Sequence, residues 1–235
     1  MFYRDCIQNT DQSFELYHKY SNIFVAFSDL NISREAFYDK LMTNLLASYD
    51  NLESFIAEYD DFQAALKPWH NGIGDDFISR MICYTAAAGV GPMASVAGAI
   101  ADSLLDKAES HTEMIVIENG GDIALTNTQE SKVLVYPGAA GITGMIMIKL
   151  PPGRWGIASS SGKFGHSLSL GQADLVTAVA KNATEADSFA TAIANRVTPG
   201  VDPRRLLTQY ANLDAILIVR NGKLWYRGEF ELSFD

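Results

Sequence analysis

The chain has 235 residues, 48% of them hydrophobic, which suffices for the core of one large domain or of two closely joined lobes. Its formal net charge of −10, with no cluster of basic residues along the sequence, argues against partners such as nucleic acids or anionic membranes. An anionic small molecule is compatible with this charge, because backbone N–H groups or a metal ion can reverse the local field.

The two cysteines, Cys6 and Cys83, lie far apart and form no CxxC pair. This number is too small for a disulfide scaffold or a cysteine-based zinc site and fits a reducing compartment. No uninterrupted apolar stretch reaches the ~18 residues of a membrane-spanning helix, and the first residues lack the apolar region of a signal peptide. We therefore expect a soluble, cytoplasmic protein. Cys83 is expected in the core, and Cys6 is the better candidate for an accessible thiol.

The N-terminal part predicts strands followed by a long helix. Residues 14–27 are rich in aromatics and partly alternate, which predicts two strands with Asn22 in the turn between them. Over residues 37–59, apolar residues recur at steps of three and four, the period of an amphipathic helix, with Ser33 as its N-cap. A capping-box pattern at residues 50–53 predicts that this helix can break and restart there.

Two further helices are predicted before residue 103. Asp75 or Asp76 can cap a helix that ends at Ala88, and the segment 89–92 breaks it, with a proline placed for the first turn of the next helix. That next helix, residues 93–102, is unusually poor in large side chains. Small residues suit the close approach of a ligand or tight packing against another backbone, and the sequence favours neither.

The second half alternates strands and helices. Helices are predicted at residues 184–196 and 203–211, and Asn221-Gly222 suits the type I′ turn of a hairpin over residues 215–227. This order predicts an α+β fold without repeats or a flexible linker. We expect one domain over residues 1–235, with two tightly joined lobes (1–90 and 91–235) as the alternative. The other predicted strands are residues 113–117, 123–125, 132–136, 144–150, 154–158 and 173–180.

Three polar segments contain candidate site residues. In the turn Asn119-Gly120-Gly121-Asp122, consecutive glycines permit unusual backbone geometry, and the amide and carboxylate could bind a sugar hydroxyl or a cofactor. A plain turn is the alternative.

Asp187 and Thr191 are four residues apart and therefore share one helix face. Their oxygens suit Mg²⁺ if further oxygens complete the shell. A surface acid beside a threonine bonded to its own backbone is the alternative.

The third segment, residues 158–166, is rich in hydroxyls and glycines. His166 would titrate near neutrality and could serve as an acid, a base or a phosphate contact, or could only order the turn.

Four blocks taken in order resemble the ApbE superfamily, whose characterised members are FAD:protein FMN transferases. More closely, Gly91-Pro-Met-Ala together with Ser161-Gly-Lys-Phe-Gly-His-Ser167 is similar to the UPF0280 branch of ApbE-like proteins. The four blocks are Ala97-Gly-Ala-Ile-Ala-Asp102, Glu118-Asn-Gly-Gly-Asp-Ile123, Ser159-Ser-Ser-Gly-Lys-Phe164 and Ala186-Asp-Ser-Phe-Ala-Thr-Ala192.

The resemblance implies an ApbE-like fold of mixed or antiparallel sheets flanked by helices, and an enzyme that attaches FMN from FAD to a Thr or Ser of a target protein, using Mg²⁺. A backbone carbonyl near Gly98 would be a third metal ligand. Ala97 stands where the transferases have a lysine, and the segment before His166 is shortened. The residues carried over are Asp187 and Thr191 as metal ligands, His166 and Asp102 as catalytic groups, and Asn119, Gly120, Gly121, Asp122, Ser160, Ser161 and Gly162 around the flavin.

Three functions follow as hypotheses. The first is a flavin- or nucleotide-diphosphate-binding transferase that uses Mg²⁺, with a small-molecule ligand and a protein acceptor as partners. The second is a sulfur-assimilation enzyme, concerned with homocysteine or persulfide and acting through Cys6 or Cys83, which the resemblance to the UPF0280 branch suggests. The third is a non-catalytic flavin- or nucleotide-binding protein. Each is compatible with an oligomer.

Overall fold

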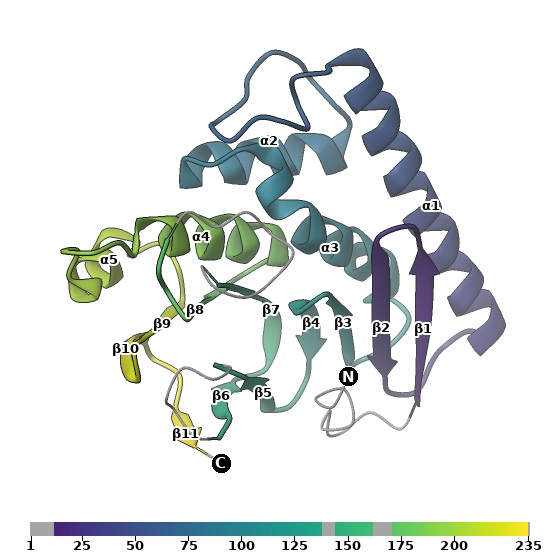
Figure 1. Cartoon of the computed structure of the whole chain (residues 1–235). Helices are drawn as coiled ribbons and strands as arrows, with labels where there is room; N and C mark the ends of the chain where they lie inside the picture. The colour runs from purple at the N-terminus through teal and green to yellow at the C-terminus, as the bar shows by residue number, and fades with distance from the viewer. Residues whose placement is uncertain (1–11, 138–143, 162–170, 235) are drawn as a thin grey trace.

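The computed structural model describes residues 12–137, 144–161 and 171–234. Its centre is an eight-stranded sheet in the order β1-β2-β3-β4-β7-β8-β9-β10, in which every neighbouring pair is antiparallel (Figure 1). The strands are β1 (Gln12–His18), β2 (Ser21–Phe27), β3 (Ile115–Asn119), β4 (Asp122–Asn127), β7 (Gly153–Ser160), β8 (Leu175–Ala180), β9 (Ala215–Arg220) and β10 (Lys223–Gly228).

A smaller antiparallel sheet lies below the large one in Figure 1, in the order β11-β6-β5. It consists of β5 (Ser131–Val135), β6 (Ile146–Leu150) and β11 (Leu232–Phe234). Its inward side chains, such as Ile148, pack with Leu125 and Val179 of the large sheet in one apolar cluster. β11 is absent from the strands predicted from the sequence, because three residues are too few to show an alternating pattern.

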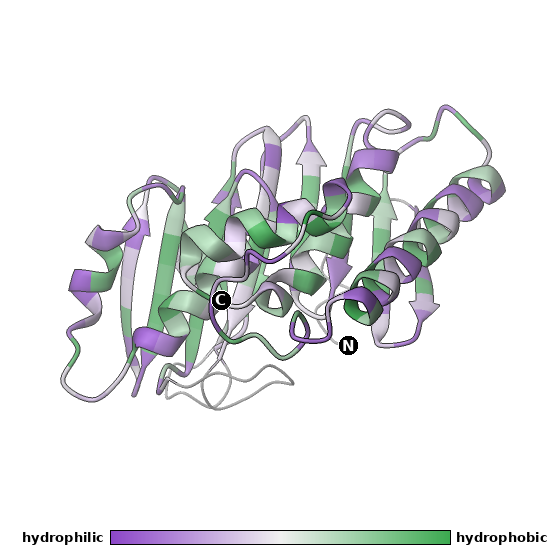
Figure 2. Ribbon diagram, turned by 90° about the horizontal axis from the view of Figure 1, so that it is seen from above, coloured by the Kyte–Doolittle hydropathy of each residue, from purple (hydrophilic) through white to green (hydrophobic). Residues whose placement is uncertain are grey.

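Helices cover the opposite face of the large sheet. They are α1 (Arg34–Glu58), α2 (Asp76–Ala88), the 3₁₀ turn η2 (Pro92–Ser95), α3 (Val96–Ala108), α4 (Ala183–Arg196) and α5 (Pro203–Gln209). Seen from above, the helices lie across strands in which hydrophobic residues predominate (Figure 2). One apolar cluster joins α1, α2 and α3 to β2 and β3, and a second joins α4 and α5 to β7, β8 and β9. The α+β prediction is confirmed.

Local capping chemistry explains where the helices begin and end. The Ser33 hydroxyl accepts a hydrogen bond from the N–H of Ala36, and the Asp75 carboxylate accepts one from Ile78, so both caps were predicted correctly. Gly89 ends α2 in the left-handed conformation, at φ 81°. The predicted break at residues 50–53 is wrong, because the buried Leu52 and Phe55 bind the last turns of α1 to the core.

Two other predictions are corrected. The turn between β1 and β2 lies at Lys19 and Tyr20, with Lys19 at φ 48°, whereas Asn22 belongs to β2. Cys83 is exposed on α2 and is not a core residue.

Within the described residues, no single helix is both long and apolar enough to cross a membrane. Among the helices of the described ranges, one pair, α2 with residues Pro92–Ala108, is long and apolar enough when its two helices are taken together, but the pair is bent by 103°.

Candidate active site

The start of α4 meets α3 at a close contact beside the β3–β4 turn. Oδ2 of Asp187 accepts a hydrogen bond of 3.0 Å from the backbone N–H of Gly98. Thr191 follows one turn later on the same helix face, with 8% of its surface exposed. The two oxygen donors predicted from their spacing therefore lie on the buried side of α4.

Glycine at position 98 makes this contact possible. A Cβ there would lie 2.4 Å from the carbonyl oxygen of Ala183 and 2.9 Å from Cβ of Asp187, closer than a side chain allows. At this position, the lack of bulk serves helix-to-helix packing, one of the two readings that the sequence left open.

The turn between β3 and β4 is fixed by its own side chains. Asn119 and Asp122 pair across the hairpin, and Gly120 and Gly121 both have positive φ, 67° and 106°. The Glu118 carboxylate accepts a hydrogen bond of 2.7 Å from the N–H of Gly121. Nδ2 of Asn119 donates to the carbonyl oxygen of Ala97 at 3.2 Å, which ties the turn to the start of α3.

The carboxyl groups of Asp122 on β4 and Asp187 on α4 are neighbours, and the charge of Asp187 affects the pKa of Asp122. The pKa of Asp187 is raised to about 7, chiefly by burial; the Gly98 N–H opposes the rise, and the negative charge of Asp102 contributes to it. Burial also raises the pKa of Asp122 well above its usual value, and the neighbouring charge of Asp187 adds to this rise. A site with two such carboxyls is suited to a bound cation.

β7 contributes a buried hydroxyl on the helix side of the sheet. Side chains alternate along the strand: Ile157 packs toward the small sheet and Ala158 toward α4, so Ser160 also points toward the helices. Ser160 is 5% exposed, and its Oγ has no hydrogen-bond partner among the described residues. Ser159, on the opposite face, bonds to the Thr177 hydroxyl at 2.9 Å.

Asp102 has no exposed surface, and both of its carboxylate oxygens accept hydrogen bonds from the start of α4. The donors are the N–H of Ala183 at 2.9 Å, and the N–H and hydroxyl of Thr184 at 2.8 and 2.6 Å. Burial raises the pKa of Asp102, while these hydrogen bonds act in the opposite direction. The geometry gives this carboxylate a role in placing α4.

Two residues that support the site, Asn182 and Arg154, were not predicted from the sequence. Asn182 caps α4 by accepting the N–H of Glu185 at 2.8 Å, and an Asn just before a helical segment could have indicated it. Arg154 on β7 donates to Glu109 at 3.0 Å and to Asp106 at 2.6 Å, and it lies 4.0 Å from Asp102. No local pattern indicates Arg154, because its partners are about 45 residues away in the sequence.

The structure thus brings together residues of α3, α4, β7 and the β3–β4 turn. Gly162 and His166 lie outside the described residues, and Ser161 is partly buried just after β7. Within the described ranges, no group of three or more His, Cys, Asp or Glu side chains is arranged to hold a metal ion. Any metal here would therefore need hydroxyl, carbonyl or ligand oxygens beside the carboxylates.

Comparisons with known proteins agree with this architecture. A family model described as "AbpE bacteria" matches residues 4–221. A UPF0280 protein of Methanosphaerula palustris is 39% identical over 160 residues, which cover 67% of this chain and 68% of the relative. A UPF0280 protein of Archaeoglobus fulgidus is 37% identical over 165 residues, covering 69% and 68%.

Two solved structures share the fold at low sequence identity. The Pseudomonas stutzeri flavinyl transferase ApbE in its apo form superposes with a TM-score of 0.60 at 12% identity, covering 95% of this chain and 94% of that one. The ApbE protein of Thermotoga maritima gives a TM-score of 0.57 at 14% identity, with 93% and 97% covered.

Proposed function

This chain belongs to the UPF0280 family, an ApbE-like family, and we propose that it is a flavin-binding transferase that uses Mg²⁺. One observation carries the proposal: Asp187, which accepts the N–H of Gly98 and shares a face of α4 with Thr191, has the buried carboxyl group of Asp122 on β4 as its neighbour. The named function of the Pseudomonas stutzeri protein, which shares the fold, supports the flavin assignment.

The donor chemistry fits Mg²⁺. Asp187 and Thr191 offer a carboxylate and a hydroxyl, the hard oxygen donors that Mg²⁺ binds, and ligand phosphates commonly supply the remaining positions. Burial raises the pKa of Asp187, which means that its charged form is disfavoured at this position. A bound Mg²⁺ would supply a compensating charge and neutralise a diphosphate.

The flavin or nucleotide part of the ligand is proposed to lie against the β3–β4 turn and the end of β7. Asn119, Gly120, Gly121 and Asp122 would form one wall, and Ser160, Ser161 and Gly162 the other. The buried Ser160 hydroxyl, unpartnered among the described residues, supports this placement because such a group costs free energy unless a ligand or water satisfies it.

The proposed reaction transfers FMN from FAD to a hydroxyl of a protein acceptor. The acceptor oxygen forms a new P–O bond, the diphosphate bond breaks, and AMP leaves. His166 is proposed to take the proton from the acceptor hydroxyl. Asp102 is proposed to position α4 rather than to move a proton, because both of its oxygens are occupied by hydrogen bonds. Neither a sulfur-handling enzyme nor a non-catalytic binding protein is favoured by a comparable observation.

Calorimetric titration of the full chain with FAD, FMN and ADP, each with and without Mg²⁺, tests the proposal. We expect FAD to bind more tightly with Mg²⁺ and this enhancement to be lost in Asp187→Ala. Asp60→Ala removes an exposed acid outside the site and is the matched control. Absence of binding by all three compounds, or equal binding by the wild type and Asp187→Ala, would overturn the proposed pocket. Tight binding of FAD without transfer to any acceptor would instead support a binding protein.

A further inference from the structure

The fold gathers six basic side chains around α5, although the sequence contains no run of them. Residues 196–227 hold six cations against two carboxylates, Asp202 and Asp214, in a chain with a net charge of −10. We call these six residues the cationic surface: Arg196, Arg204, Arg205, Arg220, Lys223 and Arg227.

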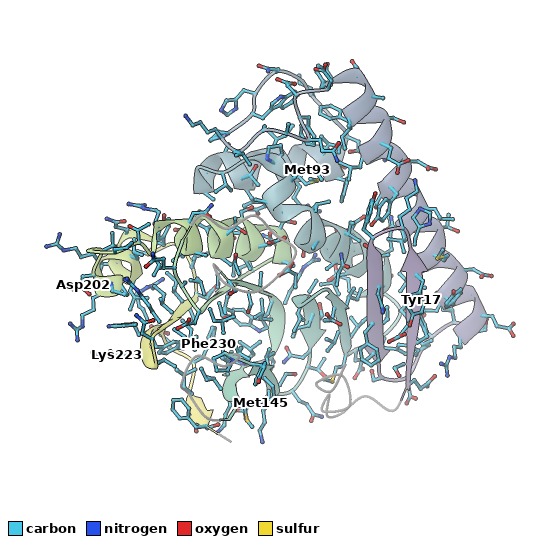
Figure 3. The ribbon with its side chains drawn as sticks, viewed as in Figure 1. Tyr17, Met93, Met145, Asp202, Lys223 and Phe230 are labelled. Carbon is cyan, nitrogen blue, oxygen red and sulfur yellow. The ribbon has the colours of Figure 1, made fainter. Side chains whose placement is uncertain are left out.

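Hydrogen bonds hold three of these side chains against residues that lie just before and just after α5. Arg196 donates to the hydroxyl of Tyr210, and Arg227 donates to the carbonyl oxygen of the same tyrosine, both at 2.8 Å. Arg220 donates to the carbonyl oxygen of Thr198 at 3.2 Å. In Figure 3, the labelled side chains of Asp202 and Lys223 mark the side of the molecule on which α5 and β10 lie.

Acidic partners for the cationic surface are absent from the described part of the chain. None of its six side chains forms an ion pair with any residue in the described part of the chain. Arg220 and Lys223 are directly opposite each other in the register of β9 and β10, where like charges destabilise a strand pair. An acidic partner would relieve this repulsion.

The same chain carries a surface of opposite charge. Residues 50–76 hold seven exposed carboxylates against one cation, Lys67. We call these carboxylates the acidic surface; they lie at the end of α1 and along the segment that leads into α2, at the top of Figure 1. Its members are Asp50, Glu53, Glu58, Asp60, Asp61, Asp75 and Asp76.

In the described part of the chain, most of the acidic surface also lacks a cationic partner, and the same segment carries exposed apolar side chains. Within the described residues, Glu53 pairs with Lys19 and the other six acids form no ion pair. Glu58 lies in the last turn of α1, where a negative charge opposes the helix dipole. Leu66 is 69% exposed and Ile73 is 92% exposed in the same segment, and such apolar side chains rimmed by polar ones are typical of protein–protein contacts.

We propose that copies of this chain associate head to tail, with the cationic surface of one copy docked on the acidic surface of the next. The complementary charges are both present in one chain, and salt at physiological strength screens the repulsion between whole molecules beyond about 8 Å. Because the two surfaces differ, the contact is heterologous and produces a closed ring or an open filament.

Sedimentation velocity with charge-reversal variants of the full chain tests this proposal. At physiological ionic strength, about 0.15 M, the wild type is expected to sediment as an oligomer, and at about 1 M salt, where the screening length is near 3 Å, as a monomer. Arg204→Glu/Arg205→Glu and Asp50→Lys/Asp60→Lys are each expected to be monomeric at physiological ionic strength. Mixing the two variants is expected to restore association, because each offers the charge that the other lacks.

Lys132→Glu reverses an exposed charge on β5 outside both surfaces and should leave the oligomer intact. A wild type that is monomeric at physiological ionic strength would overturn the proposal and would favour a different, acidic protein as the partner of the cationic surface. An oligomer that both double reversals leave unchanged would also overturn it. Circular dichroism of each variant separates loss of association from loss of folding.

Discussion

The carboxylate of Asp187 on α4 accepts a hydrogen bond from the backbone N–H of Gly98 on α3, at 3.0 Å. This bond spans 89 residues of sequence and fixes the spacing of two helices that both border the candidate site. The two helices can approach this closely because Gly98 has no side chain. Substitutions at Gly98 and Asp187 therefore test how the packing of α3 against α4 affects the candidate site.

Gly98→Ala is expected to destabilise the protein by about 1–3 kcal/mol, the usual cost of overpacking. Its new Cβ would meet the carbonyl oxygen of Ala183 at 2.4 Å, so α3 and α4 would have to separate. Urea unfolding measures the loss. Asp187→Asn changes the same contact without adding volume. Comparing the two variants therefore separates the steric effect of the methyl group at position 98 from the effect of losing the Asp187 carboxylate. An unchanged unfolding midpoint for Gly98→Ala would show that the helices separate freely.

Asp102→Ala is expected to lower the free energy of unfolding by about 3 kcal/mol or more, because it leaves several buried donors without an acceptor. These donors are the two N–H groups and the hydroxyl at the start of α4. Asp106→Asn, in the same helix but exposed, is the control and should cost much less. Equal losses in the two variants, measured by urea unfolding, would contradict the role of Asp102 in holding α4.

Local chemistry made part of this fold predictable. Ser33 and Asp75 act as caps through side chains adjacent to the helices they begin, and Asn221-Gly222 forms the expected turn with positive φ at both residues, 51° and 71°. The resemblance to ApbE-like proteins supplied the family, and the comparisons confirm it. The caps and the turn depend on a few neighbouring residues, and the family resemblance depends on the order of motifs along the chain.

Long-range relationships were not predictable in the same way. The face of α2 that carries Cys83 is exposed only because the other face packs on α1 and α3, and the sequence of α2 alone does not show this. Likewise, the coupling of Asp122 and Asp187 depends on strand order and helix position together. A residue's role in the site follows from its neighbours in space, as the bonds of Asp102 to α4 demonstrate.

The stability contributed by Asp187 is expected to fall as pH rises. Burial raises its folded-state pKa from 3.8 to about 7, so the folded state holds the proton more tightly than the unfolded state does. The corresponding stability is fully present below about pH 4 and is lost as pH increases toward 7, at roughly 1.4 kcal/mol per unit of pKa shift. Unfolding in chelator at several pH values measures this loss.

Asp187→Asn supplies the reference for that measurement, because its amide does not titrate. The free energy of unfolding of the variant should improve relative to the wild type between pH 4 and pH 7. A constant difference between the two proteins across this range would contradict a raised pKa for Asp187.

Thr191→Val tests whether the hydroxyl on α4 serves ligand binding or only packing. Thr191 is 8% exposed, and valine has nearly the same shape, so the unfolding midpoint should change little if no ligand is bound. If the hydroxyl helps to hold Mg²⁺, the enhancement of FAD binding by Mg²⁺ should fall about tenfold, equivalent to about 1.4 kcal/mol. Thr191→Ser keeps the hydroxyl and should preserve the enhancement, both variants being followed by calorimetry. If Mg²⁺ enhances FAD binding by Thr191→Val as much as by the wild type, Thr191 is not a ligand in the proposed metal site. The contribution of Asp187 would then be judged from Asp187→Ala alone.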